Sequence, residues 1–113
     1  RERLVAIRAG RSVLDGRFGL VLPPGEMAVC TSSGTVGHSA SGGRADAVVI
    51  AAADGACADA LATGTANRVS SPADMEGAVR WARGRGPVRQ VVIICGEALA
   101  AWGDFELRPL GAA

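Results

Sequence analysis

A glycine- and hydroxyl-rich segment and the helix predicted after it contain most of the residues that could do chemistry. The segment runs from Cys30 to Ser39 and reads CTSSGTVGHS. Its glycines and small hydroxyl side chains leave backbone N–H groups uncovered, an arrangement that builds phosphate-binding concavities. A tight turn between two strands is the alternative interpretation.

The predicted helix carries two oxygen donors, Asp59 and Thr63, among small residues. Their spacing of four places both side chains on one face of the helix, one turn apart. Such a pair could bind a metal ion. It could also be an ordinary half-exposed aspartate beside a threonine that bonds back to a helix carbonyl.

Three further residues complete the candidates: Cys30, His38 and Asp46. Cys30 could be a nucleophile or persulfide carrier with His38 as its base, although a free cysteine is more often a small buried hydrophobe. His38 could instead contact a phosphate or be a hydrogen-bonded loop residue. Asp46 begins an apolar run, so it is either a loop-capping carboxylate or an active-site group.

Composition narrows the function classes. The 113 residues suit one domain, and the arginines are scattered among acids with a formal net charge of +1, which argues against a nucleic-acid-binding face. Cys30, Cys57 and Cys95 are far apart in apolar contexts, which is typical of reduced thiols. No run of about 18 apolar residues and no leader is seen, so we expect a cytoplasmic protein without a membrane span.

The elements that position these residues can be predicted from periodicity and turn residues. Strands are expected at residues 4–7, 18–22, 28–30, 45–52 and 88–95. A last hairpin is expected from residues 98–102 and 105–107, closed near Gly103 and Asp104.

Two helices are predicted in the middle of the chain. The first runs from about Gly55 to Asn67, with Asp54 as its N-cap. The second begins after Ser71 as N-cap with Pro72 at its first position, and its buried face consists of Met75, Ala78, Val79 and Ala82. The order of elements predicts an α+β fold in which two helices pack against a mostly antiparallel sheet.

The CTSSGTVGHS segment, together with residues 45–48, 58–63, 67–69 and 101–104, resembles a widespread family of bacterial and archaeal proteins related to ApbE. The resemblance covers Leu4 to Leu107 and implies that residues 1–113 are the C-terminal half of an ApbE-like domain. A sheet cut in this way would expose a strand edge. The expected partner is therefore the missing N-terminal half or a second chain, including a second copy in a homo-oligomer.

ApbE proteins are magnesium-dependent transferases that cleave FAD and attach FMN to a protein threonine, and an Asp-Ala-x-x-Thr run holds part of their metal site. Residues 59–63 read DALAT, so the resemblance implies that Asp59 and Thr63 bind Mg²⁺. Residues 32–34 are similar to a Thr-Ser-Gly segment at the ApbE flavin pocket. The implied contacts to FAD or FMN are Thr31, Ser32, Ser33, Gly34, Thr35, Gly37 and Asp46.

One family feature is replaced. Where ApbE carries a long stretch ending in a His-Ile-Ile-Asp-Pro-like motif, this chain has only residues 36–39 and a short glycine link, so His38 does not simply inherit that histidine's role. The family is also linked to anaerobic sulfur assimilation towards homocysteine. The expected function is an ApbE-like, Mg²⁺-dependent flavin-nucleotide binder or transferase; the alternatives are a sulfur or acyl transferase using Cys30 and His38, and a non-catalytic ApbE-like remnant.

Overall fold

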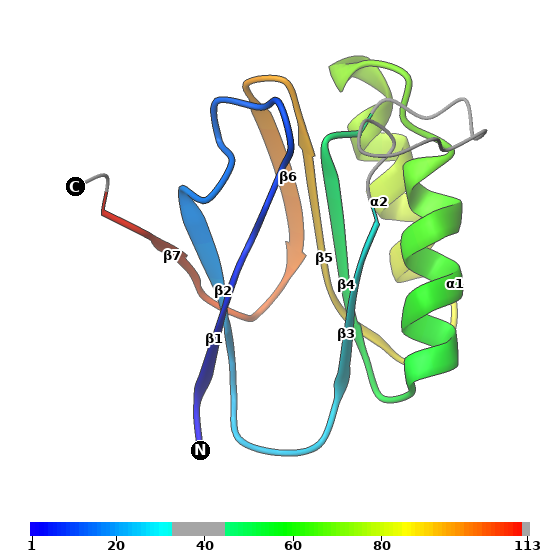
Figure 1. The fold of residues 1–113 in the computed structure, drawn as a ribbon. Coiled ribbons are helices and arrows are strands. Elements are labelled where there is room, and N and C mark those ends of the chain that lie inside the picture. Colours follow the sequence, from blue (N-terminus) through cyan, green and yellow to red (C-terminus); the bar gives the residue numbers. More distant parts are fainter. Residues whose placement is uncertain (33–44, 112–113) are drawn as a thin grey trace.

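The computed structural model describes residues 1–32 and 45–111. They form two antiparallel β-sheets and a layer of helices, with the four-stranded sheet between the three-stranded sheet and the helices (Figure 1). The predicted α+β class is therefore confirmed, with the antiparallel strands divided between two sheets.

The three-stranded sheet has the order β1-β2-β7 and contains β1 (Arg3–Ala6), β2 (Phe18–Leu22) and β7 (Leu107–Pro109). The four-stranded sheet follows chain order and contains β3 (Ala28–Ser32), β4 (Ala47–Ala52), β5 (Val88–Cys95) and β6 (Ala98–Gly103). Every pairing in both sheets is antiparallel. The strands at the start of the chain and in its middle lie where periodicity predicts them.

The helices connect β4 to β5 and cover one face of the four-stranded sheet. They are α1 (Gly55–Ala66), a short 3-10 turn (Pro72–Asp74) and α2 (Met75–Arg83). Asp54 caps α1 as predicted, because its Oδ1 accepts a hydrogen bond from the Cys57 amide at 3.0 Å. The predicted apolar face of α2 is buried. Within the described ranges, no helix is long and apolar enough to cross a membrane.

Two hydrophobic cores lie on either side of β4 and β5. Alternate residues point to opposite faces of a strand, so Val48 and Ile93 face the helices while Val49 and Val92 face the three-stranded sheet. All four side chains are at most 1 % exposed. Burial on both faces explains why these two strands are continuous apolar runs in the sequence, a pattern also typical of buried parallel strands.

The predicted hairpin at the C-terminal end is wrong. β6 pairs with β5, whereas β7 crosses to the other sheet and pairs with β2. Gly103 directs this crossing with a φ of 125°, and a Cβ at this position would lie 2.5 Å from the Arg89 carbonyl oxygen. The buried Gln90 side chain then accepts a hydrogen bond from the Phe105 amide at 3.0 Å, which holds the chain on its path to the second sheet.

Candidate functional site

Helix α1 lies beside edge strand β3 and runs in the same direction. Its first turn is next to the start of the strand, since a Cβ at Gly55 would be 3.7 Å from the Ala28 Cβ. The Cys30 Sγ also lies 3.8 Å from the Gly55 carbonyl oxygen. Because β4 is antiparallel to β3 and leads into α1, the helix proceeds towards the Ser32 end of β3, where residues 33–44 begin.

The predicted metal ligands, Asp59 and Thr63, are both exposed on α1. The residues of α1 that face the sheet are Ala58, Leu61, Ala62, Thr65 and Ala66. At 100° per residue, Asp59 lies on the flank opposite Cys57 and Gly64. A Cβ at Gly64 would lie 2.7 Å from Trp81 of α2, and one at Gly86, in the turn after α2, would lie 3.3 Å from the Cys57 Sγ. The Asp59–Thr63 face is therefore the flank of α1 that is turned away from α2.

This donor set fits part of a magnesium site. The carboxylate and the hydroxyl supply hard oxygens one helical turn apart, and Mg²⁺ in proteins usually keeps several waters alongside one or two carboxylates. No ion pair in the described part of the chain uses Asp59. Residues 1–32 and 45–111 contain no cluster of three or more His, Cys, Asp or Glu side chains that could hold a metal. Water, a ligand or other residues would have to complete the coordination.

Most of the predicted phosphate contacts lie outside the described residues: Ser33, Gly34, Thr35, Gly37 and His38. Thr31 and Ser32 end β3, opposite Val49 and Val48 of β4. Cys30 packs against the core under the helices, so strand alternation turns Ser32 to the same side and Thr31 to the other. Ser32 is thus on the face of the sheet that carries α1, whereas Thr31 is exposed on the opposite face.

Asp46 is buried directly before β4, with 7 % of its surface exposed. Its Oδ2 accepts a hydrogen bond from the Gly96 amide at 2.7 Å, and its own amide donates to the Ile94 carbonyl at 2.8 Å. The carboxylate therefore caps the turn between β5 and β6. Burial raises the pKa of the nearby Cys95 thiol, and the negative charges of Asp46 and Asp74 raise it further. A cofactor contact by Asp46 stays a prediction.

Comparison with known proteins assigns the family. Residues 1–99 match the family model described as AbpE bacteria. The chain belongs to this ApbE-related family. The resemblance predicted from the glycine-rich segment and the DALAT run is confirmed.

Two relatives of this ApbE-related chain are each named UPF0280 protein. That of Methanoculleus marisnigri is 42 % identical over 107 residues, covering 93 % of this chain and 43 % of the relative. That of Methanothermobacter thermautotrophicus is 46 % identical over 102 residues, covering 86 % and 40 %. The ApbE-related chain thus spans about two fifths of the length of these relatives.

Cys30, Cys57 and Cys95 of this ApbE-related chain are not joined in disulfides. Cys30 is half-buried, and its Sγ points to the Gly55 carbonyl. Its proposed base, His38, lies outside the described residues. Cys57 is also half-buried, while Cys95 is buried.

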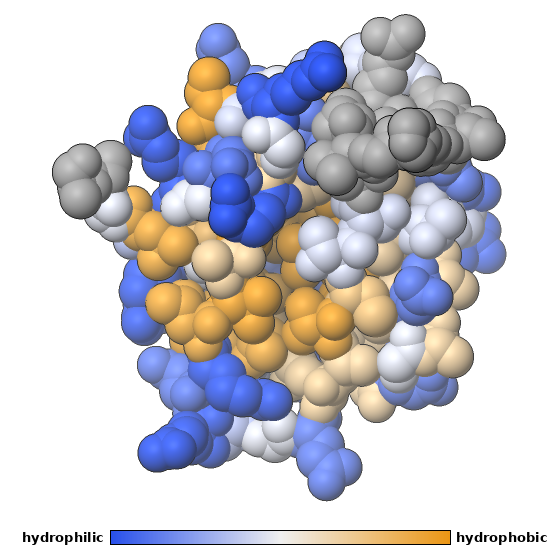
Figure 2. Space-filling view, in the orientation of Figure 1, coloured by the Kyte–Doolittle hydropathy of each residue, from blue (hydrophilic) through white to orange (hydrophobic). Residues whose placement is uncertain are grey.

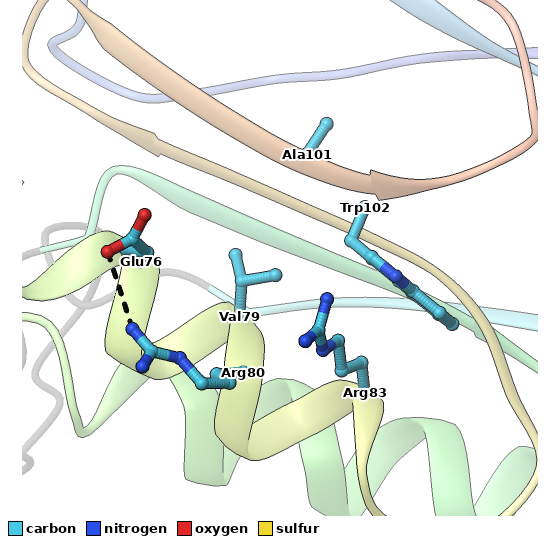
Figure 3. Close-up of a pocket in the computed structure, with 6 residues that line it drawn as sticks. All are labelled: Glu76, Val79, Arg80, Arg83, Ala101 and Trp102. Atoms are coloured by element: carbon cyan, nitrogen blue, oxygen red, sulfur yellow. Dashed lines mark hydrogen bonds and ion pairs between the residues drawn. The ribbon is translucent and has the colours of Figure 1, made fainter.

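A groove that the sequence did not predict lies between α2 and edge strand β6, as shown in Figure 3. The groove has a volume of about 480 Å³ and is lined by Glu76, Val79, Arg80, Arg83, Ala101 and Trp102. The spacing of Arg80 and Arg83 along α2 was an available clue, since residues three apart share a helix flank. The pairing of α2 with Trp102 could not be predicted, because β6 was assigned to the wrong hairpin.

Proposed function

We propose that this chain contributes the metal-binding and phosphate-facing part of an ApbE-like, Mg²⁺-dependent protein that binds a flavin nucleotide, FAD or FMN. The observation that carries the proposal is the position of Asp59 and Thr63. Both are exposed, one turn apart, on the flank of α1 turned away from α2. The adjacent strand β3 leads into the glycine-rich residues that are suited to phosphate.

Each part of the site would have its own role. Asp59 and Thr63 would hold the metal, and Mg²⁺ when bound neutralises negative charge on a pyrophosphate and polarises its phosphorus–oxygen bonds. Ser32 and the backbone N–H groups of residues 33–37 would bind the phosphate oxygens. Asp46 would fasten the start of β4, downstream of the glycine-rich segment, to the β5–β6 turn. Transfer of FMN to a protein threonine is proposed for the complete protein.

A further segment or chain is part of this proposal, because the relatives are more than twice as long as the region they share with this chain. Figure 2 shows apolar side chains gathered over β1 and β2 and towards β3. Leu4 on β1 is 48 % exposed, and Val5, Met27 and Val29 are only partly buried over the core between the sheets. β1 and β3 are also sheet edges. An upstream segment would cover this surface and pair with these edges.

Binding of FAD and of ADP to the chain together with the further segment proposed above, measured by calorimetry with and without Mg²⁺, tests the proposal. We expect binding only with Mg²⁺, and loss of binding in Asp59→Ala. Glu97→Ala is the matched control, since it removes an exposed carboxylate from the β5–β6 turn. Binding that is indifferent to Mg²⁺ or to Asp59→Ala would exclude the proposed metal ligand.

A further inference from the structure

We propose that the groove between α2 and β6 is a second binding site, which takes a small planar aromatic ligand carrying one anionic group. This second site is distinct from the proposed flavin-nucleotide site, and ligand binding to it needs no metal. α1 covers β3 and β4, whereas α2 covers β5 and β6. The groove on the β6 side of α2 is therefore separated by both helices from the flank that carries Asp59 and Thr63.

The groove has the size of a small-molecule site and a mixed lining. Its volume of about 480 Å³ lies within the range of about 300 to 1,000 Å³ typical of ligand pockets. Val79, Arg83 and Trp102 all line it, and Figure 3 shows Arg83 from the helix and Trp102 from the sheet both directed to the space between these elements.

Trp102 is held in place by the strand and by the turn that follows it. It pairs with Val91 of β5 and packs partly against the core under the helices. The required glycine at position 103 fixes the backbone directly after it. The indole also borders a second hollow of about 370 Å³ beside Val88 and Asp104. It therefore combines a fixed position with surface open to a ligand.

Most of the arginines on and near α2 have an aromatic or acidic partner. Arg68 and Arg85 lie over the Trp81 ring, at 3.6 and 4.5 Å from its centroid, and Arg89 lies over the Phe105 ring at 5.6 Å. Arg80 pairs with Glu76 at 3.3 Å. In the described part of the chain, Arg83 has neither an acidic partner nor an aromatic ring beneath it, and no arginine lies over the Trp102 ring.

The open surface of the Trp102 indole and the Arg83 guanidinium together favour one class of ligand. The indole can stack with a planar ring, and the guanidinium can donate two parallel hydrogen bonds to a phosphate, sulfonate or carboxylate. The ion pair of Arg80 with Glu76 neutralises the carboxylate of the groove, so the local field stays positive. A neutral ring would lose the anchor at Arg83, and a free anion would lose the stacking on Trp102.

Titration of the ¹⁵N-labelled chain with 1-naphthyl phosphate in the presence of EDTA tests this site. The two tryptophans give two indole N–H signals, which a Trp102→Phe variant assigns. We expect a saturable shift of the Trp102 signal and little change at Trp81. Naphthol lacks the anionic group and inorganic phosphate lacks the aromatic ring. Each should bind at least about fivefold more weakly than 1-naphthyl phosphate.

Two arginine variants provide the matched comparison. Arg83→Gln should weaken binding about fivefold or more, whereas Arg85→Gln, which removes an exposed arginine outside the groove, should leave it within about twofold. Asp59→Ala should have no effect, which separates this site from the proposed metal site. Equal shifts of both indoles, no saturable shift of Trp102, equal effects of the two arginine variants, or a loss in Asp59→Ala would each overturn the proposal.

Discussion

The Asp46 carboxylate accepts a hydrogen bond from the Gly96 amide, with 2.7 Å between Oδ2 and the amide nitrogen. The two residues are 50 positions apart in the sequence. Gly96 begins the turn between β5 and β6 with a φ of 64°, a conformation that favours glycine. The bond therefore fastens this turn to the residue directly before β4.

Asp46→Ala should destabilise the fold by about 1.5 to 3 kcal/mol, because the Gly96 amide would lose its hydrogen bond to a buried carboxylate. Glu97→Ala in the same turn removes an exposed carboxylate and should change the free energy of unfolding by no more than about 0.5 kcal/mol. Urea unfolding of the two variants measures both values. Equal stability of the two would show that the Gly96 amide does not depend on Asp46.

The same substitution should have opposite effects in the two helices. A Cβ at Gly64 of α1 would lie 2.7 Å from Cη2 of Trp81. The Arg68 guanidinium stacks on this ring, 3.6 Å from its centroid, and restricts its movement. Gly64→Ala should therefore cost about 1 to 3 kcal/mol by overpacking. A Cβ at Gly77 of α2 meets nothing within 4 Å, so Gly77→Ala should stabilise by about 0.5 to 1 kcal/mol. Thermal unfolding of both variants gives the signs, and a stabilising Gly64→Ala would contradict the tight packing of α1 on Trp81.

Asp15 should make stability depend on pH in the acid range. Its pKa is lowered from 3.8 to about 2, chiefly by the hydrogen bond from Arg8 and also by the one from the Ala9 amide. A lowered folded-state pKa means that the contribution is complete above the unfolded value near 4 and is lost as the pH falls towards 2. The free energies of unfolding of the parent chain and of Asp15→Asn, measured in urea, should therefore converge as the pH falls from about 4 to 2. A difference that stays constant across this range would argue against the lowered pKa.

Alkylation should distinguish the three thiols. Cys95 is 6 % exposed, and its pKa is raised by burial and by the charges of Asp46 and Asp74, so it should react last with iodoacetamide. Peptide mapping at intervals near neutral pH measures the order of labelling. If Cys30 reacts well before Cys57, the cysteine-based transferase becomes the better proposal. Similar slow rates at Cys30 and Cys57 would count against a nucleophilic role for Cys30.

Local patterns in the sequence determined much of the framework. The strand at 18–22, the Asp54 cap and the buried face of α2 all lie where the sequence places them. Each depends on residues within a turn or two of one another, where backbone geometry and side-chain periodicity act directly. The family was likewise readable, because the glycine-rich segment and the DALAT run are contiguous and distinctive.

Only the tertiary structure decided which distant segments meet. β7 reads as the natural partner of β6, yet it pairs with β2, because strand pattern specifies an alternating face and not the identity of the neighbouring strand. The same holds for side chains: Arg83 and Arg85 are near neighbours at the end of α2, but Arg85 lies on Trp81 while Arg83 borders the groove with Trp102. Such differences arise from packing between elements, where contacts join residues far apart in the chain.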